Sequence, residues 1–277
     1  MNVLARLTTR WGSTRPMALL RMALVAAAWS EWASGRLLYR GDTIDEFVVS
    51  VAFFVLSSLA FVGLWTRVST AAFGALAMAL VYGYGWYGGV EDYWHHHSKL
   101  LAHALFLVAL TPCGGALSVD RWRAVSAAER AGVEPPSTDG DLSATRLLCV
   151  AQAVVWFWGA WDKVEWDFLS GGRLTQIFVG HFTHMNLAQF QPTFAPLMTV
   201  ASFATVGLEF ALALGLWFRR LRPWLVPAAV LLHGTMYMLL PVGTFSVTMM
   251  LLLLAWFEPD EIEAVWSKLE GGRSAPG

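Results

Sequence analysis

The stretch Gln152-Ala-Val-Val-Trp-Phe-Trp-Gly-Ala-Trp161 is apolar and runs without a break into Asp162-Lys-Val-Glu-Trp-Asp167. An apolar run of this length predicts a helix, and a lysine flanked by three carboxylates stands at its end. Placing an ammonium group at the mouth of a membrane-spanning helix costs free energy, so such a residue is a functional hypothesis by default. Lys163 is therefore the first candidate residue.

The composition of the whole chain indicates a membrane protein. Of its 277 residues, 56% are hydrophobic and only 14% are charged, whereas soluble domains carry about 25% charged residues. The fifteen tryptophans fit the same class, because indole rings favour the membrane interface. A net charge of −1 gives no sign of a nucleic-acid partner. We expect an all-α, polytopic membrane helix bundle in a lipid bilayer.

Apolar segments long enough to cross a bilayer recur along the chain. A span needs about 20 apolar residues, or somewhat fewer where the bilayer thins. The sequence predicts about eight transmembrane helices: Met17–Ala33, Phe47–Trp65, Thr70–Val90, Lys99–Thr111, Thr145–Trp161, Leu197–Phe218, Trp224–Leu240 and Val242–Phe257.

The distribution of basic residues predicts the orientation of these spans. Most lysines and arginines lie in loops on one side, which places both termini in the cytoplasm of a multi-pass cell-membrane protein. We expect one domain over residues 1–277, with a short N-terminus at 1–16, a flexible cytoplasmic loop at 114–144 and a tail at 258–277. Glu258–Glu263 predicts a short amphipathic helix that opens on an acidic turn. Lys163 and most candidate histidines then face the extracytoplasmic side.

Two interpretations of Lys163 are compatible with the sequence. An ammonium near hydrocarbon loses hydration, which favours the neutral amine and makes the residue a candidate base. The acids Asp162, Glu165 and Asp167 oppose this effect by favouring the charged form. Alternatively, the lysine extends to the interface and pairs with a neighbouring acid, which would be a structural role.

Other ionisable residues lie inside the predicted spans or at their ends. His95–His97 and His103 do not match a known zinc-binding spacing, so we expect hydrogen-bonded histidines and no metal. His233 lies in an apolar span and is a candidate either for function or for a hydrogen bond to a neighbouring helix. Arg21 and Glu209 also lie within spans, and we expect them to pair with each other as a structural ion pair.

Several segments, in this order, resemble the membrane domain of the vitamin K-dependent gamma-carboxylase and its microbial relatives, the HTTM (horizontally transferred transmembrane) family. The resemblance covers roughly Leu19 to Phe257. The segments that carry it are Gly63-Leu-Trp-Thr-Arg67, Tyr93-Trp-His-His-His-Ser98, Leu117-Ser-Val-Asp120 with Arg121-Trp122, the Gly159 to Gly171 segment around Lys163, and Leu232-His-Gly followed by Gly243-Thr-Phe-Ser246.

The resemblance implies a specific chemistry. In the carboxylase, a lysine at the position matching Lys163 acts as base toward vitamin K hydroquinone, which then reacts with O2 before CO2 adds to a glutamate. His97 and His233 match histidines of the family and would orient the quinol or stabilise its oxyanion. A menaquinol-like isoprenoid quinone would thus be the cofactor of a bacterial inner-membrane enzyme. Its pocket would be lined by Trp94, His96, Trp161, Trp166 and His184.

The chain departs from the family pattern at three places. An acid, Asp162, stands where the family has the first lysine of a pair, and His96 replaces an asparagine. The chain also ends about twenty residues after its last predicted span, whereas the carboxylase continues into a large extramembrane domain. A peptide substrate would then need a partner protein for its recognition. The alternative function is a non-catalytic membrane partner in the maturation or assembly of a peptide or redox enzyme. Transport has weaker support, since no inverted repeat is visible.

Overall fold

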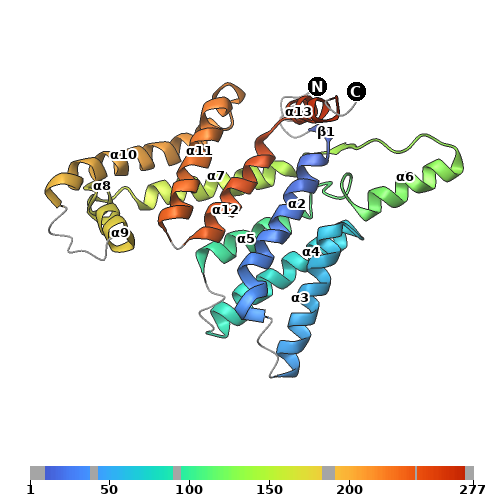
Figure 1. The fold of residues 1–277 in the computed structure, drawn as a ribbon, viewed down its shortest axis with the longest axis horizontal. Coiled ribbons are helices and arrows are strands. Elements are labelled where there is room, and N and C mark those ends of the chain that lie inside the picture. The colour runs from blue at the N-terminus through green and yellow to red at the C-terminus, as the bar shows by residue number, and fades with distance from the viewer. Residues whose placement is uncertain (1–9, 38–42, 90–94, 183–190, 241, 272–277) are drawn as a thin grey trace, which may run out of the picture. The chain divides into compact units, whose positions relative to one another are not determined.

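The computed structural model describes residues 10–37, 43–89, 95–182, 191–240 and 242–271 (Figure 1). The chain forms two compact units. The first unit comprises residues 1–148 and 251–277, and the second comprises residues 149–250. Nearly all regular structure in both units is helical, as the composition predicts.

The first unit is built from helices and one small two-stranded sheet. Its elements, in chain order, are β1 (Trp11–Ser13), α2 (Arg15–Ala28) with a π-helical continuation (Trp29–Leu37), α3 (Ile44–Val62), α4 (Thr66–Met78) with a π-helical continuation (Ala79–Tyr87), α5 (His96–Val108), α6 (Val119–Ala131), β2 (Asp139–Asp141), a 3-10 turn (Leu253–Trp256) and α13 (Pro259–Gly271).

Close helix packing forms the core of the first unit. Helix α4 packs against α3 and α5, and α2 packs against the same two helices. Gly74 permits the α4–α5 contact, because a Cβ atom there would lie 2.7 Å from the backbone of Phe106. The buried rings of Trp32, Phe53 and Phe73 meet edge to face, with centroids 6.3 and 5.3 Å apart. The close approach at the glycine and the edge-to-face ring pairs together favour a single packing arrangement of these helices.

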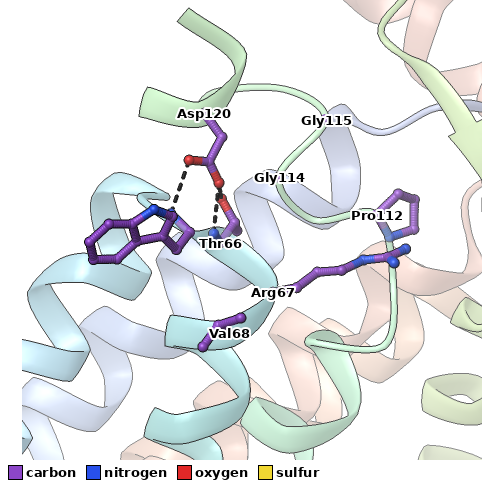
Figure 2. A pocket seen from close by; sticks show the side chains of 8 residues that line it. Thr66, Arg67, Val68, Pro112, Gly114, Gly115 and Asp120 are labelled. Carbon is purple, nitrogen blue, oxygen red and sulfur yellow. Dashed lines mark hydrogen bonds between the residues drawn. The ribbon is translucent and has the colours of Figure 1, made fainter. Parts of the chain in front are cut away.

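The turn between α3 and α4 is held by a carboxylate from α6 (Figure 2). Helix α3 ends at Gly63 in the left-handed region, with φ of 71°, and Trp65 has a φ of 48°. Asp120 accepts hydrogen bonds from the backbone N–H of Trp65 at 2.9 Å, and from the backbone N–H and hydroxyl of Thr66 at 2.7 Å each. A carboxylate at a helix N-terminus satisfies donors that the helix leaves open. Asp120 therefore caps α4 from a distant part of the chain.

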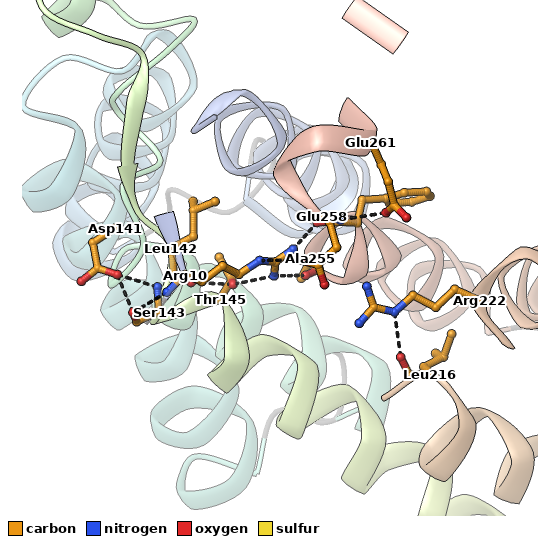
Figure 3. Close-up of polar contacts among 11 residues, drawn as sticks. Arg10, Asp141, Leu142, Ser143, Thr145, Leu216, Arg222, Ala255, Glu258 and Glu261 are labelled. Carbon is orange, nitrogen blue, oxygen red and sulfur yellow. Dashed lines mark hydrogen bonds and ion pairs between the residues drawn. The ribbon is translucent and has the colours of Figure 1, made fainter. Parts of the chain in front are cut away.

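Arg10 connects segments of the first unit that lie far apart in the sequence (Figure 3). The guanidinium of Arg10 donates to the hydroxyl of Thr145 and the carbonyl of Ala255, both at 3.1 Å, and to the carbonyl of Phe257. It also forms an ion pair with Glu258 at 3.3 Å. Nearby, β1 pairs antiparallel with β2. The N-terminal strand, the start of α7 and the segment before α13 are thereby tied together.

The second unit consists of helices and connecting turns. Its elements are α7 (Thr145–Asp162, which starts in the first unit), α8 (Trp166–Leu169), α9 (Gly172–Phe182), α10 (Gln191–Gly215), a 3-10 turn (Arg219–Leu221), α11 (Arg222–Leu239) and α12 (Gly243–Leu252).

A glycine turn docks the segment after α7 onto α10. Gly171 has a φ of 80°, and a Cβ atom there would lie 2.4 Å from the backbone nitrogen of Thr199. The hydroxyl of Thr199 donates to the carbonyl of Ser170 at 2.6 Å. Only glycine combines this backbone conformation with so close an approach. The turn therefore fixes α8 and α9 against α10, on the helix that also carries Glu209.

The helices agree with the predicted apolar segments. In the described ranges, three are long and apolar enough to cross a membrane: Ile44–Val62, Thr66–Tyr87 and Ala195–Gly215. Two shorter apolar helices are His97–Val108 and Gly243–Trp256. The all-helical fold is thus confirmed, with three helices that could cross a membrane, while the total of about eight spans stays a prediction. The predicted tail helix with an acidic first turn is confirmed as α13. Helix α6 and strand β2 lie in the segment where we expected a flexible loop.

Candidate functional site

Lys163, at the end of α7, forms a buried ion pair with Glu209 of α10. Its ammonium lies 2.8 Å from Oε2 and 3.0 Å from Oε1 of Glu209, and it donates a further hydrogen bond to the carbonyl of Gly159 at 2.8 Å. The side chain of Glu209 is 5% exposed and that of Lys163 is 26% exposed. The carboxylate is thus enclosed, whereas the amine keeps one open side.

The partner of Lys163 is not one of its neighbours in the sequence. Glu165 directly precedes α8 and Asp167 lies within it, and both side chains are exposed, 3.7 Å from the guanidinium of Arg173. Glu209 lies far along the chain, on a different helix. Lys163 therefore forms an ion pair, but its partner is not one of the acids close to it in the sequence.

The predicted pairing of Arg21 with Glu209 is wrong. Arg21 is fully buried in α2 and donates to the carbonyls of Cys113 and Leu117 at 2.7 Å and of Phe61 at 3.3 Å. The carbonyl of Phe61 lies in the last turn of α3, those of Cys113 and Leu117 lie in the segment between α5 and α6, and such open carbonyls carry partial negative charge that a guanidinium satisfies. Arg21 and Glu209 are both buried, but each charge has another partner.

Two residues of α7 and the residue directly after the helix form a stripe along one face. Trp156, Gly159 and Lys163 are spaced at i, i+3 and i+7, which places them on the same side over two turns. A Cβ atom on Gly159 would lie 3.5 Å from Nζ of Lys163 and 3.8 Å from Oε2 of Glu209. The glycine therefore lies directly beside the ion pair, and the stripe connects the ion pair with Trp156.

Trp156 continues the site to His233 of α11. Both residues are 1% exposed, and the indole Nε1–H donates to Nε2 of His233 at 3.0 Å. An indole nitrogen can only donate, so Nε2 of a neutral His233 carries no proton and Nδ1 must carry it. Nδ1 is buried and has no hydrogen-bond partner among the residues that the structure describes. His233 thus presents an unused N–H donor.

His97 belongs to the first unit, at the start of α5. Its ring stacks on that of His95, with centroids 4.9 Å apart. The next residue, Ser98, donates to the carboxylate of Glu31 at 2.9 Å. Glu31 lies in the π-helical continuation of α2, and such irregular turns are frequent at functional sites. Glu31 was not among the predicted residues, although a carboxylate within an apolar stretch is itself a signal.

The predicted pocket residues have different outcomes. Trp94 and His184 lie outside the described residues, and His96 is described only as the first residue of α5. Trp161 and Trp166 are described, and they are 58% and 77% exposed. Within the described ranges, no group of three His, Cys, Asp or Glu side chains is placed to hold a metal ion.

Two segments of the predicted resemblance come into contact. The Gly63 to Arg67 turn meets Asp120, as described above, around a hollow of about 430 Å³ that is lined by Trp65, Thr66, Arg67, Val68, Pro112, Gly114, Gly115 and Asp120 (Figure 2). The hydrogen bonds in this hollow connect the turn between α3 and α4 to the start of α6. Burial raises the pKa of the Asp120 carboxyl, but the hydrogen bonds from Thr66 and Trp65 outweigh it and hold the pKa below its usual range.

Comparison with known proteins gives one match. A family model described as an HTTM domain matches residues 42–260, which include α3 to α12 and the start of α13. Comparison with curated proteins gave no match, and comparison with solved structures gave none.

Proposed function

The chain belongs to the HTTM-domain family, and on this premise we propose that it is a quinol-dependent membrane enzyme with Lys163 as its base. The single observation that carries the proposal is the arrangement in the second unit. A partly open amine meets a buried carboxylate at the end of α7, and an imidazole with an unused donor is hydrogen-bonded to Trp156, about two turns earlier along the same helix. Family membership relates the chain to gamma-carboxylase membrane domains, and this arrangement supplies the groups that quinol chemistry needs.

The proposed proton transfer begins inside the ion pair. As an ammonium, Lys163 donates to Glu209 and Gly159, and it has no free electron pair because its nitrogen is protonated. Removing two charges from water costs several kcal/mol per ion, so a neutral amine beside a carboxylic acid is an accessible second state. One proton moves from Nζ to Glu209 along the 2.8 Å hydrogen bond. The amine then accepts a proton from a quinol hydroxyl, and the electron pair of the broken O–H bond stays on the quinol oxygen.

His233 is proposed to bind the quinol oxygen. Because Nε2 already accepts from Trp156, only Nδ1–H can reach a ligand, and a donor suits an oxygen that gains negative charge. Phe245 packs on the same ring, with centroids 5.7 Å apart. This apolar setting suits a quinone with an isoprenoid tail. The role of His97, in the first unit, stays a prediction from the sequence.

The setting of the enzyme is part of the same proposal. We place about eight spans in the cell membrane, here a bacterial inner membrane, with both termini cytoplasmic and Lys163 toward the extracytoplasmic side. Reaction of the quinolate with O2 would give the epoxide. Addition of CO2 to a glutamate would need a peptide substrate, and a partner protein would be one way to recognise that peptide.

A second candidate function has its own support. Lys163 and Glu209 satisfy each other's hydrogen bonds, which is also what a purely structural pair would do. The chain would then be a non-catalytic membrane partner in the maturation or assembly of a peptide or redox enzyme. The two candidates differ in whether a proton leaves the amine.

The test is epoxide formation by the purified, detergent-solubilised protein. The protein is incubated without oxygen with a reduced naphthoquinol, then exposed to air, and the epoxide is measured by chromatography. Lys163→Met should lower the rate by a factor of about 10² to 10⁴, the usual contribution of a general base. Lys163→Arg should do the same while keeping the pair with Glu209, because arginine does not lose its proton.

Lys268→Met is the matched control, since Lys268 is an exposed lysine of α13. It should retain wild-type activity. Epoxide from the wild type and the control, but not from Lys163→Arg, supports the enzyme. No epoxide from the wild type, with no shift in melting temperature on adding the quinone, supports the non-catalytic partner instead.

A further inference from the structure

An apolar groove lies between the end of α10 and the start of α11. It encloses about 370 Å³, and only apolar residues line it. These residues are Phe210, Ala211, Leu214, Gly215, Phe218, Leu221, Trp224 and Leu225. Several remain open to the surroundings of the chain, with Trp224 78%, Phe218 64% and Leu214 60% exposed. In a membrane protein, such a surface faces lipid.

The groove is flanked by positive charge. The turn that joins the two helices carries Arg219 and Arg220, and α11 begins at Arg222. Arg219 and Arg220 are exposed, whereas Arg222 is half-buried and donates to the carbonyl of Leu216 at 2.9 Å (Figure 3). No Asp or Glu occurs between Phe210 and Phe257 in the sequence, so this segment carries a net positive charge.

Apolar groove and arginine turn together define the chemistry of the occupant. Basic residues at a membrane surface attract anionic lipid headgroups, and tryptophans such as Trp217 and Trp224 favour the headgroup level. A quinone headgroup carries no charge and gives the arginines no partner. The hollow beside Asp120 offers a contrast, because it contains one arginine, Arg67, and one carboxylate, and so no excess charge.

We propose that this groove binds one acyl chain of an anionic phospholipid whose phosphate is held by the Arg219–Arg220 turn. The lipid would lie against both helices and hold the α10–α11 hairpin at the membrane surface. The inference does not depend on the proposed enzyme activity, because it uses neither Lys163 nor His233.

The test measures lipid binding to the full-length, detergent-purified protein by native mass spectrometry. Phosphatidylglycerol is titrated against phosphatidylcholine with the same acyl chains. The wild type should bind phosphatidylglycerol about tenfold more tightly, and the double variant Arg219→Gln/Arg220→Gln should lose most of this preference. Ala211→Trp, which fills the groove, should weaken the binding of both lipids.

The matched control is Arg123→Gln/Arg130→Gln, which removes two exposed arginines of α6 and changes the net charge equally. It should keep the preference. Equal affinity for the two lipids, or an equal loss in the control, would overturn the proposal. So would displacement of the lipid by menaquinone, or a rise in melting temperature with inorganic phosphate alone that matches the rise with phosphatidylglycerol. Unchanged elution on gel filtration verifies that the variants fold.

Discussion

Two buried cations of this protein are neutralised in different ways. Arg21, in the first unit, has no exposed surface and donates to three backbone carbonyls. Lys163, in the second unit, keeps 26% of its side chain exposed and faces the carboxylate of Glu209. Carbonyl oxygens accept hydrogen bonds but not protons, and a guanidinium does not release one. The first cation is therefore fixed in charge, while the second faces a group that is able to accept a proton.

This difference distinguishes a buried charge with a structural role from an ion pair that could take part in a proton transfer. Arg21 joins the end of α3 to the segment between α5 and α6, where its absence would leave carbonyls without donors. The Lys163–Glu209 pair joins α7 to α10, but it also has two protonation states of the same total charge. Ionisable residues within spans are thus not equivalent, and the type of partner indicates which of them is available for a reaction.

The largest expected effect is that of Arg21→Met on stability. The substitution removes the donors of three carbonyls, and each buried unsatisfied group costs about 1–3 kcal/mol, so we expect a loss of about 3 kcal/mol or more. Thermal unfolding followed by tryptophan fluorescence in detergent measures the change. Arg21→Lys keeps the charge and fewer donors, so its melting temperature should fall between those of the wild type and Arg21→Met. A melting temperature of Arg21→Met equal to that of the wild type would remove the scaffold role.

A double-mutant cycle addresses the other cation. Lys163→Met and Glu209→Gln each leave a buried charge without its partner, whereas the double variant leaves none. We therefore expect the double variant to be more stable than the sum of the single effects predicts, with a coupling of about 1–2 kcal/mol. The same unfolding assay measures it. Purely additive effects would contradict a direct interaction between the two side chains in the membrane-like environment.

The sequence predicted the local features of this protein well. Each predicted apolar segment coincides with a helix, because hydrophobicity and helix formation both depend on neighbouring residues. The tail helix, with Asp260 and Glu261 in its first turn, was predicted for the same reason. Helix α6 was missed although its signals were present. Ser118 caps its N-terminus, and Gly132 ends it in the left-handed conformation.

Partners across long distances were not predictable. Glu209 follows Lys163 by 46 residues, and Asp120 caps α4 from 54 residues away. Strand β1 pairs with β2 through three residues on each side, too few to give a periodic pattern. Which charges meet depends on how helices pack, and a single sequence does not contain that information in local form. The pairing of Arg21 with Glu209 failed for this reason.

The smallest expected effect concerns Asp120, the carboxylate that caps α4 and accepts no hydrogen bond from Arg21 or Lys163 in the described part of the chain. Burial alone would raise the pKa of Asp120, but hydrogen bonds from Thr66 and Trp65 lower it below the ordinary value. A group with a lowered pKa in the folded state stabilises the protein above its unfolded pKa, near pH 4, and this stabilisation is lost as the pH falls through the folded pKa. Asp120→Asn should therefore be less stable than the wild type at pH 7.

Asparagine still accepts through its amide oxygen, so the loss should be about 1 kcal/mol or less, the lower part of the range for helix caps. The difference in melting temperature between wild type and variant should shrink as the pH falls from about 4 through the lowered folded pKa, because Asp120 is protonated in both states only below that folded pKa. Asp139→Asn is the matched control, since this exposed carboxylate accepts no hydrogen bond in the described part of the chain. A difference that persists unchanged at low pH would mean that the charge of Asp120 does not stabilise α4, and that its hydrogen bonds act through geometry alone.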